Sequence, residues 1–428
     1  MKKSLFMTSA TAVGLALVLN ACAGEEGGGN AGSSNNESNA EASGDQTQIS
    51  FIHWRGEDSE VFDEIIDEFE AEHPDITVEM NIYPSEQYQS NAQQMLRDGS
   101  VGDVFTSFPG SQFEVIQNAG FFEDLTDEDF VGNFNAEAIE IGQADGQQMA
   151  LPYQMVFNMP VYNVDMFDEL GLEPPNSWDE FLEMGDTLLE NDITPIAFPG
   201  GDIGPNQFMN SMMMNNAPDE DIFAKLEAGE EQLTNEWWVS TLEDFQTLLD
   251  REFISQDALG IQQDSAIAAV AQEEAAMLAT GSYHMASLTE QNPDLNLDFL
   301  APITVAEDEA IYEGIHTATF MLGVNANSDK QEEAKQFIDY LSQPEVASKY
   351  ANETGQHLTI EDVDYTSEAL EDTAYWLTDK ETRFQPRFFI TNSSVENAVL
   401  SSIEQVLGGD DPQSAAEQAQ QVVDQNID

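Results

Sequence analysis

The stretch that decides the fold is residues 49–80, which read ISFIHWRGEDSEVFDEIIDEFEAEHPDITVEM. Ile49–Trp54 predicts a strand, and apolar residues then recur at helical spacing from Val61 to Phe69. Pro74 ends the predicted helix, and Ile76–Met80 alternates like a second strand. A strand, a helix and a strand within about 30 residues predict a βαβ unit. The fold should therefore be built on a sheet that contains parallel strands.

Strand-like and helical segments keep alternating along the rest of the chain. Further strands are predicted at 104–106, 194–198, 274–278 and 320–324. Further helices are predicted at 88–97, 178–189, 332–341, 395–407 and 415–423. The methionines between Met209 and Met214 have helical spacing and indicate adaptable core filling, as do Trp237 and Trp238 on a predicted helix. The alternation predicts an α/β fold with mostly parallel sheets.

The first residues predict an export signal and a membrane anchor. Lys2 and Lys3 precede an apolar stretch, 5–19, that is too short for a comfortable membrane span. The stretch ends in Leu-Asn-Ala-Cys at 19–22, which resembles the bacterial lipobox. That resemblance implies a signal peptide at 1–21 and lipidation of Cys22. The alternative is an ordinary secretory signal with an incidental cysteine. Residues 22–48 predict a flexible acidic linker, because 23–48 holds no apolar side chain larger than alanine.

The charge is extreme and excludes several classes of partner. The chain has 82 acidic and 12 basic residues, for a formal net charge of −70. Phosphate binding needs a basic surface, so nucleic acid is excluded as a partner. Lying flat on an anionic membrane is disfavoured for the same reason. A surface this acidic should keep the protein hydrated and monomeric where salt screens the repulsion between its charges. We therefore predict a saline or alkaline habitat. Equal stability with and without molar salt would argue against that habitat.

No motif of a catalytic, cofactor or metal site stands out. The sequence lacks a phosphate-binding loop, a dinucleotide-binding glycine pattern and a nucleophile elbow. The 5 histidines are scattered and form no metal-binding pair, and Cys22 as the single cysteine excludes an intramolecular disulfide. With so many carboxylates, a glycosidase-like pair arises by chance. We therefore predict no catalytic residue, no cofactor and no metal.

Several segments share an order and spacing that is informative when they are taken together. They are FEAEHPDITV at 69–78, GSVGDVF at 99–105, NAGFFEDL at 118–125, LPY at 151–153, YNVDMF at 162–167, GLEPPNSWDEF at 171–181, EAAM at 274–277, GSY at 281–283 and KQFIDYLSQPE at 335–345. Together they resemble the extracellular solute-binding proteins of family 1, which include maltose- and multiple-sugar-binding proteins. The resemblance runs from Ile49 to the C-terminus, and Gly102 stands where the family has proline.

The resemblance implies a two-lobed, periplasmic-binding-protein-like fold of type II with the ligand in the cleft. One lobe would comprise 49–155 plus 310–350, and the other 156–309 plus 351–428. A hinge between them would let the lobes close around the ligand. The implied function is to capture a mono- or oligosaccharide at the extracellular face of the membrane and deliver it to an ABC permease with its ATPase. The implied protein is not an enzyme.

A sugar presents hydroxyl groups and flat C–H faces, so its site needs aromatic platforms and oriented donors and acceptors. The resemblance and the predicted strand ends together indicate these candidate ligand-binding residues: Trp54, Arg55, Gly110, Ser111, Tyr153, Gln154, Asp202, Tyr283, His284, His316, Phe388 and Asn392.

Each candidate in the first half of the chain has a structural alternative. Trp54 ends the first strand, where side chains face the cleft, and the alternative is packing inside a lobe. Arg55 either donates to ligand hydroxyls or pairs with nearby acids. Gly110 and Ser111 follow the third strand, where family members contact ligand, and otherwise form a capped turn. Tyr153 and its neighbour lie near the first crossover and contact either the ligand or the hinge.

The later candidates have alternatives of the same kind. Asp202 either accepts sugar hydroxyls or caps a helix. Tyr283 stands where the family often has a stacking tryptophan, with His284 beside it. His316 borders the site or is a structural histidine. Phe388 and the asparagine four residues later precede the 395–407 helix.

Two rival functions remain open from the sequence. One is binding of another solute, such as a peptide, a polyamine or a glycerol phosphate, and few cations are present to hold a phosphate ester. The other is a secreted carbohydrate-active enzyme. Released products would indicate an enzyme, whereas a thermal shift with sugar and no product would indicate a binding protein.

Overall fold

The computed structural model describes residues 46–427, except 98, 100 and 218, and these residues belong to one compact unit. The predicted signal peptide, Cys22 and nearly all of the predicted linker lie outside this described part. The linker prediction ran two residues too far, because Thr47 and Gln48 already pair with Ile76 and Thr77 in a sheet. None of the helices in the described part is long and apolar enough to span a membrane.

The first sheet has seven strands and begins with the predicted βαβ unit. Strand β1 (Thr47–His53), helix α1 (Ser59–Glu72) and strand β2 (Ile76–Ile82) form that unit, with both strands parallel. The strand order is β12-β6-β11-β3-β1-β2, and β13 pairs with β11. The other strands are β3 (Val104–Ser107), β6 (Leu151–Phe157), β11 (Gly314–Val324), β12 (His357–Leu358) and β13 (Thr382–Phe384).

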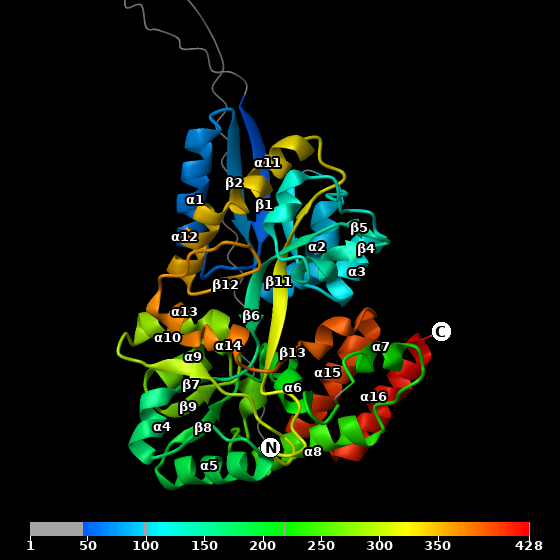
Figure 1. Cartoon of the computed structure of the whole chain (residues 1–428). Helices are drawn as coiled ribbons and strands as arrows, with labels where there is room; N and C mark the ends of the chain where they lie inside the picture. The colour runs from blue at the N-terminus through cyan, green and yellow to red at the C-terminus, as the bar shows by residue number, and fades with distance from the viewer. Residues whose placement is uncertain (1–45, 98, 100, 218, 428) are drawn as a thin grey trace, which may run out of the picture. The chain divides into compact units, whose positions relative to one another are not determined.

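Helices cover both faces of this sheet (Figure 1). One buried cluster joins the sheet to α1 through Phe62 and to two later helices through Phe337 and Tyr350. A second cluster joins the other face to Tyr88 and Phe113. The helices concerned are α11 (Gln331–Leu341), α12 (Pro344–Thr354), α2 (Ser85–Leu96) and α3 (Ser111–Asn118). A two-stranded hairpin, β4 (Gln143–Ala144) and β5 (Gln147–Gln148), and two 3₁₀ helices, η1 (Asp129–Asn133) and η2 (Ala138–Gly142), complete this lobe.

The second sheet has four strands in the order β10-β7-β9-β8. These are β10 (Leu297–Phe299), β7 (Val161–Asn163), β9 (Ala275–Leu278) and β8 (Thr194–Ala197). The helices around it are α4 (Val164–Leu170), α5 (Trp178–Glu190), α6 (Gly204–Met213), α7 (Ile222–Glu227), α8 (Glu236–Asp250), α9 (Gln263–Ala271), α10 (Met285–Gln291), α13 (Glu368–Thr373), α14 (Tyr375–Thr378), α15 (Ser393–Leu407) and α16 (Pro412–Asn426). Three 3₁₀ helices, η3 (Ala258–Gly260), η4 (Ser282–His284) and η5 (Pro386–Phe389), lie between them.

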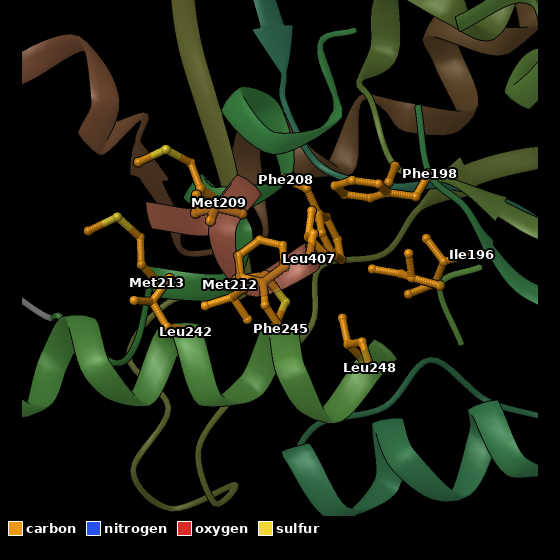
Figure 2. Packing of buried hydrophobic residues seen from close by; sticks show 14 of the residues in the cluster. Ile196, Phe198, Phe208, Met209, Met212, Met213, Leu242, Phe245, Leu248 and Leu407 are labelled. Atoms are coloured by element: carbon orange, nitrogen blue, oxygen red, sulfur yellow. The ribbon is translucent and has the colours of Figure 1, made fainter. Parts of the chain in front are cut away.

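The methionines on α6 fill the core of this second lobe, as predicted. Figure 2 shows Met209 and Met212 among the side chains of Phe208, Leu242 and Phe245. Unbranched methionine side chains adapt to the irregular gaps between helices and aromatic rings. The predicted core role of Trp237 and Trp238 is also confirmed, because both are buried in this cluster.

The prediction of mostly parallel sheets is wrong, although the α/β class and the two lobes are confirmed. The pairs β1–β2, β1–β3, β8–β9 and β11–β13 are parallel, whereas β6 and β11 pair antiparallel with each other and with β12 and β3. The reason is topological: β6 leads out of the first lobe and β11 leads back into it (Figure 1). A chain that leaves and returns between the same two bodies must run in opposite directions.

The packing also moves two predicted lobe boundaries. Residue 350, where the first lobe was predicted to end, lies inside α12. The segment directly after this helix stays with the first lobe, because β12 pairs with β6 and Ile360 belongs to the same buried cluster as Phe51. Tyr312 and Ile315, which were predicted in the first lobe, pack instead with Phe157 in the second lobe's cluster.

Candidate functional site

A cavity of about 360 Å3 lies between the two lobes. Trp54 and Phe108 follow directly on the carboxyl ends of β1 and β3, and Gly201 and Tyr283 lie in the segments that come after β8 and β9. Carboxyl ends of strands are where α/β sheets bind ligands. The first lobe contributes Trp54, Arg55, Glu57, Pro84, Ser85, Gln87 and Phe108. The crossing strands and the residue after β6 contribute Gln154, Val156, Asn158 and Thr319. The second lobe contributes Gly201, Asp202, Ile203, Gln207, Gln262, Gln263, Tyr283, His284 and Phe388.

An aromatic wall forms one side of the cavity. Trp54 and Phe108 stack with ring centroids 3.8 Å apart and an interplanar angle of 19°. Behind them, Phe320 packs edge-on against Trp54 at 5.2 Å. Phe320 has a φ of 52°, which is uncommon for a bulky residue and occurs in the middle of crossing strand β11. The wall is therefore held by the core of the first lobe and offers an apolar face to a ligand.

Arg55 is buried and already paired with carboxylates. Its Nε and Nη2 donate to both oxygens of Asp58 at 2.8 and 3.1 Å, and its Nη1 lies 3.2 Å from Glu57. Tyr350 donates its hydroxyl to the same aspartate at 2.5 Å. Burial lowers the pKa of Arg55, but the carboxylates of Asp58 and Glu57 outweigh burial and raise it above the usual value. The guanidinium is thus a fixed cation whose charge is balanced by the neighbouring carboxylates of Asp58 and Glu57.

Tyr283 faces Arg55 across the cavity. The guanidinium carbon lies 5.8 Å from the centre of the tyrosine ring, within the range of a cation–π contact. Burial raises the pKa of Tyr283, so its hydroxyl stays protonated. Burial and the nearby Arg55 lower the pKa of His284 to about 3, so this imidazole is neutral near pH 7. Its Nδ1 lies 2.9 Å from Oγ1 of Thr280, which holds the ring in place.

Several residues that line the cavity carry buried polar atoms that have no hydrogen-bond partner within the described part of the chain. These atoms are Oδ1 of Asn158, Oε1 of Gln207, Oγ1 of Thr319 and the hydroxyl of Tyr283. Buried polar groups are nearly always paired, and leaving one unpaired costs about 1–3 kcal/mol. All four groups are neutral: Asn158 and Thr319 come from the crossing segments, and Gln207 and Tyr283 come from the second lobe. This arrangement suits a ligand that brings its own hydroxyl groups.

The structure brings many of the predicted residues together at this cavity: Trp54, Arg55, Gln154, Asp202, Tyr283, His284 and Phe388. Gln154 has a second role, because its amide nitrogen also contacts Asp58 at 3.4 Å and the Tyr350 hydroxyl at 2.5 Å. Arg55 pairs with acids, which is one of the two alternatives posed for it, and it also lines the cavity.

Other predicted residues lie elsewhere. Tyr153 is buried in the first lobe and donates its hydroxyl to the Leu341 backbone oxygen at 3.1 Å, because alternation along β6 turns it away from the cavity. Asn392 caps α15 by accepting from the backbone amide of Ser394 at 2.9 Å. His316 lines a separate cavity of about 420 Å3 together with Met155 of β6. Its Nδ1 lies 2.9 Å from Oγ1 of Thr382.

Gly110 and Ser111 also do not line the cavity. They lie where the two lobes meet, and Ser111 donates its hydroxyl to Glu396 of the second lobe. Gly110 has a φ of 78°, and a Cβ there would lie 2.9 Å from the Phe388 backbone oxygen. A side chain at position 110 would therefore push the lobes apart.

Sequence reasoning missed several residues of the cavity. Asn158 follows Gln154 and Val156 at every second position along and just beyond β6, so strand alternation alone could have identified it. Phe108 follows a predicted strand end and carried the same kind of signal as Trp54. Gln207 and the Gln262–Gln263 pair carried no signal, because they lie at helix starts and not at strand ends.

Comparison with known proteins matches residues 55–348 to the family model described as bacterial extracellular solute-binding protein. Among curated proteins, the chain is 22% identical over 325 residues to the multiple sugar-binding protein of Streptococcus mutans, covering 74% of this chain and 76% of that one. It is 22% identical to the melibiose/raffinose/stachyose-binding protein MelE of Bacillus subtilis, covering 80% of each.

Solved structures have the same fold. The raffinose complex of the solute-binding protein RafE matches with a TM-score of 0.76 and 20% identity, over 90% of this chain and 100% of that one. A chitin oligosaccharide binding protein matches with a TM-score of 0.78 and 19% identity, again over 90% and 100%. These matches confirm the two-lobed α/β architecture predicted from the sequence.

Proposed function

Because the chain belongs to the bacterial extracellular solute-binding protein family, we propose that it captures a carbohydrate in the cavity between its lobes and delivers it to an ABC importer. The observation that carries the proposal is that one cavity combines an aromatic wall, Trp54 on Phe108, with neutral polar residues that carry unpartnered hydrogen-bonding atoms. A sugar ring has an apolar face for the wall and hydroxyls for those atoms. The relatives named for multiple sugars, raffinose and stachyose support the same class of ligand.

The charges around the cavity favour an uncharged sugar. The charged lining residues in the described part are Arg55, Glu57 and Asp202. The single cation is paired with Asp58 and Glu57, so little of its charge is available to an anionic ligand. A phosphate ester or sugar acid would lose its hydration without a free cation to replace it. The volume of about 360 Å3 is near the lower end of ligand pockets, which span about 300–1,000 Å3, and favours a short saccharide.

A thermal-shift screen followed by calorimetry tests the proposal. The panel contains neutral mono- and oligosaccharides, including melibiose, raffinose and chitin oligosaccharides, with a sugar phosphate, a short peptide and spermidine as comparison ligands. We expect a rise in melting temperature with one or more neutral sugars and none with the sugar phosphate. A thermal shift only with spermidine or the peptide would mean that the ligand is that kind of solute and not a carbohydrate.

We also propose that the protein binds without turning over its ligand. Chromatography of the same sugars after long incubation with the protein should show unchanged saccharides at every time point. New, shorter products would instead indicate a secreted carbohydrate-active enzyme.

The proposal extends to the anchor and the partners. Lipidation of Cys22 would tie the protein to the extracellular face of the membrane, where a permease and its ATPase receive the sugar. Labelled fatty acid should appear in the chain and be absent from a Cys22→Ser variant. The net charge of −70 further supports a saline or alkaline habitat, and the free energy of unfolding should then rise with molar salt as repulsion is screened.

A further inference from the structure

A buried ion pair in the second lobe reaches across to the first lobe beside the cavity. Arg387 on η5 donates from Nε to Oε1 of Glu396 at 2.7 Å, and both side chains are largely buried, with exposed fractions of 7% and 14%. The backbone amide of Arg387 also donates to Oδ1 of Asn210 at 3.1 Å. These contacts fix the direction of the carboxylate on α15.

The second oxygen of that carboxylate accepts a hydrogen bond from Ser111. Ser111 is the first residue of α3, whose Phe113 packs in the core of the first lobe, whereas α15 packs in the core of the second lobe. The backbone beside it approaches just as closely, since a Cβ on Gly110 would lie 2.9 and 3.0 Å from the Phe388 and Ile390 backbone oxygens. The contact therefore joins the two lobes directly.

We propose that Ser111, Arg387 and Glu396 form an interlobe clasp that sets the affinity of the site without touching the ligand. The proposal rests on the proposed function, because it concerns how the lobes close over the sugar. Ser111 and Glu396 can meet only when the lobes approach, so their hydrogen bond favours the closed arrangement. A protein whose binding-competent state is less populated binds its ligand more weakly by the same factor. Arg387 and Glu396 are positioning residues, and Ser111 is the group that engages on closure.

The clasp lies next to the cavity but is separate from it. Phe388, the neighbour of Arg387, lines the cavity and is buried against the Gly110 backbone. The clasp residues themselves are not among the cavity lining. A change at Ser111 should therefore alter how long the sugar stays bound rather than which sugar is chosen.

The test compares Ser111→Ala with Ser111→Thr, which keeps a hydroxyl, and with Ser414→Ala as a matched control. Ser414 is also in the first turn of a helix, and its hydroxyl contacts only Gln418 of the same helix. A hydrogen bond to a charged group is worth about tenfold or more in an equilibrium constant. We expect Ser111→Ala to weaken sugar binding about tenfold, mainly through faster dissociation, and the other two variants to bind within about twofold of the unchanged protein.

A double-mutant cycle separates a clasp from a direct ligand contact. In a Glu396→Ala background the clasp is already broken, so adding Ser111→Ala should weaken binding by less than about twofold. A full tenfold loss in that background would mean that the hydroxyl acts on the ligand, and the proposal would be overturned. Unchanged affinity in the single Ser111→Ala variant would also overturn it.

A measurement without sugar keeps the two proposals apart. Small-angle scattering of the sugar-free proteins should give a larger radius of gyration for Ser111→Ala than for the unchanged protein and for Ser414→Ala. This comparison remains decisive if Glu396→Ala does not fold, or if no sugar binds and the proposed function fails. Equal radii in all three proteins would overturn the clasp.

Discussion

Replacing Tyr283 by phenylalanine removes one hydroxyl group and leaves the ring in place. That hydroxyl is buried at the cavity and has no hydrogen-bond partner within the described residues. In the sugar-free protein its removal breaks no bond recorded in the structure, so the free energy of unfolding should stay the same or rise slightly. In the sugar complex the same removal leaves a ligand hydroxyl without a partner, so the affinity should fall.

The magnitude follows from the contacts. A neutral hydrogen bond contributes about 0.5–1.5 kcal/mol, so Tyr283→Phe should weaken sugar binding by roughly two- to tenfold. Tyr283→Ala also removes the ring, which lies 5.8 Å from the Arg55 guanidinium, and Tyr283 lines the cavity. Losing the ring contact adds about 1 kcal/mol or more, so the alanine variant should bind more weakly by at least a further fivefold.

The assay pairs calorimetric affinity with urea unfolding, and Tyr153→Phe is the matched control. The Tyr153 hydroxyl donates to the Leu341 backbone oxygen inside the first lobe. Its loss should cost about 1 kcal/mol of stability and leave the affinity unchanged, which is the opposite of the Tyr283 result. Equal sugar affinity in Tyr283→Phe and the unchanged protein would refute the assignment of this hydroxyl to the ligand.

Three further predictions test other features. Gly110→Ala should weaken sugar binding about tenfold or more, because the added Cβ would lie 2.9 Å from a backbone oxygen of the other lobe. Calorimetry should find no such loss for Gly120→Ala, because Gly120 has a similar φ of 72° and an added Cβ there would meet no described atom within 4 Å. Asp58→Asn removes the carboxylate that holds the buried Arg55 guanidinium by two hydrogen bonds and should lower the free energy of unfolding by about 3–5 kcal/mol in urea. Asp186→Asn, which breaks an exposed pair, should lower it by less than about 1 kcal/mol. Burial and the nearby Arg55 lower the pKa of His284 from its ordinary value of 6.5 to about 3, so only the unfolded chain takes up this proton as the pH falls from 6.5 towards 3, and stability is lost over that window. His284→Gln should reduce this slope by up to about 1.4 kcal/mol per pH unit, and unchanged slopes in urea titrations at several pH values would contradict the assignment.

The local spacing of apolar and polar residues was sufficient to predict most of the helices and strands. The strand predicted at 104–106 is β3 (Val104–Ser107), and the helix predicted at 178–189 is α5 (Trp178–Glu190). Both are short-range consequences of apolar periodicity and of capping, since Ser177 accepts from the Glu180 amide as a helix cap. Strand direction has no such local signal, and this is why the sheets were predicted to be mostly parallel.

The candidate site also contains some residues that the sequence indicated and others that it misplaced. Trp54 follows the end of a strand, where side chains of an α/β sheet face the cleft, so the strand end indicated it, whereas the family resemblance indicated Tyr283; both line the cavity. Tyr153 was misplaced by a single position, because neighbouring residues of a strand point to opposite faces. Ser111 was expected at the ligand and instead bonds to Glu396, a residue 285 positions away in sequence.

The sequence by itself determined the α/β class, the βαβ start, the order of the helices and the family resemblance, because each depends on the spacing of neighbouring side chains. Only the tertiary structure decided which polar atoms remain unpartnered in the cavity, how Arg55 is neutralised and where the lobes touch. Those features depend on distances between groups far apart along the chain, and local periodicity carries no information about such distances.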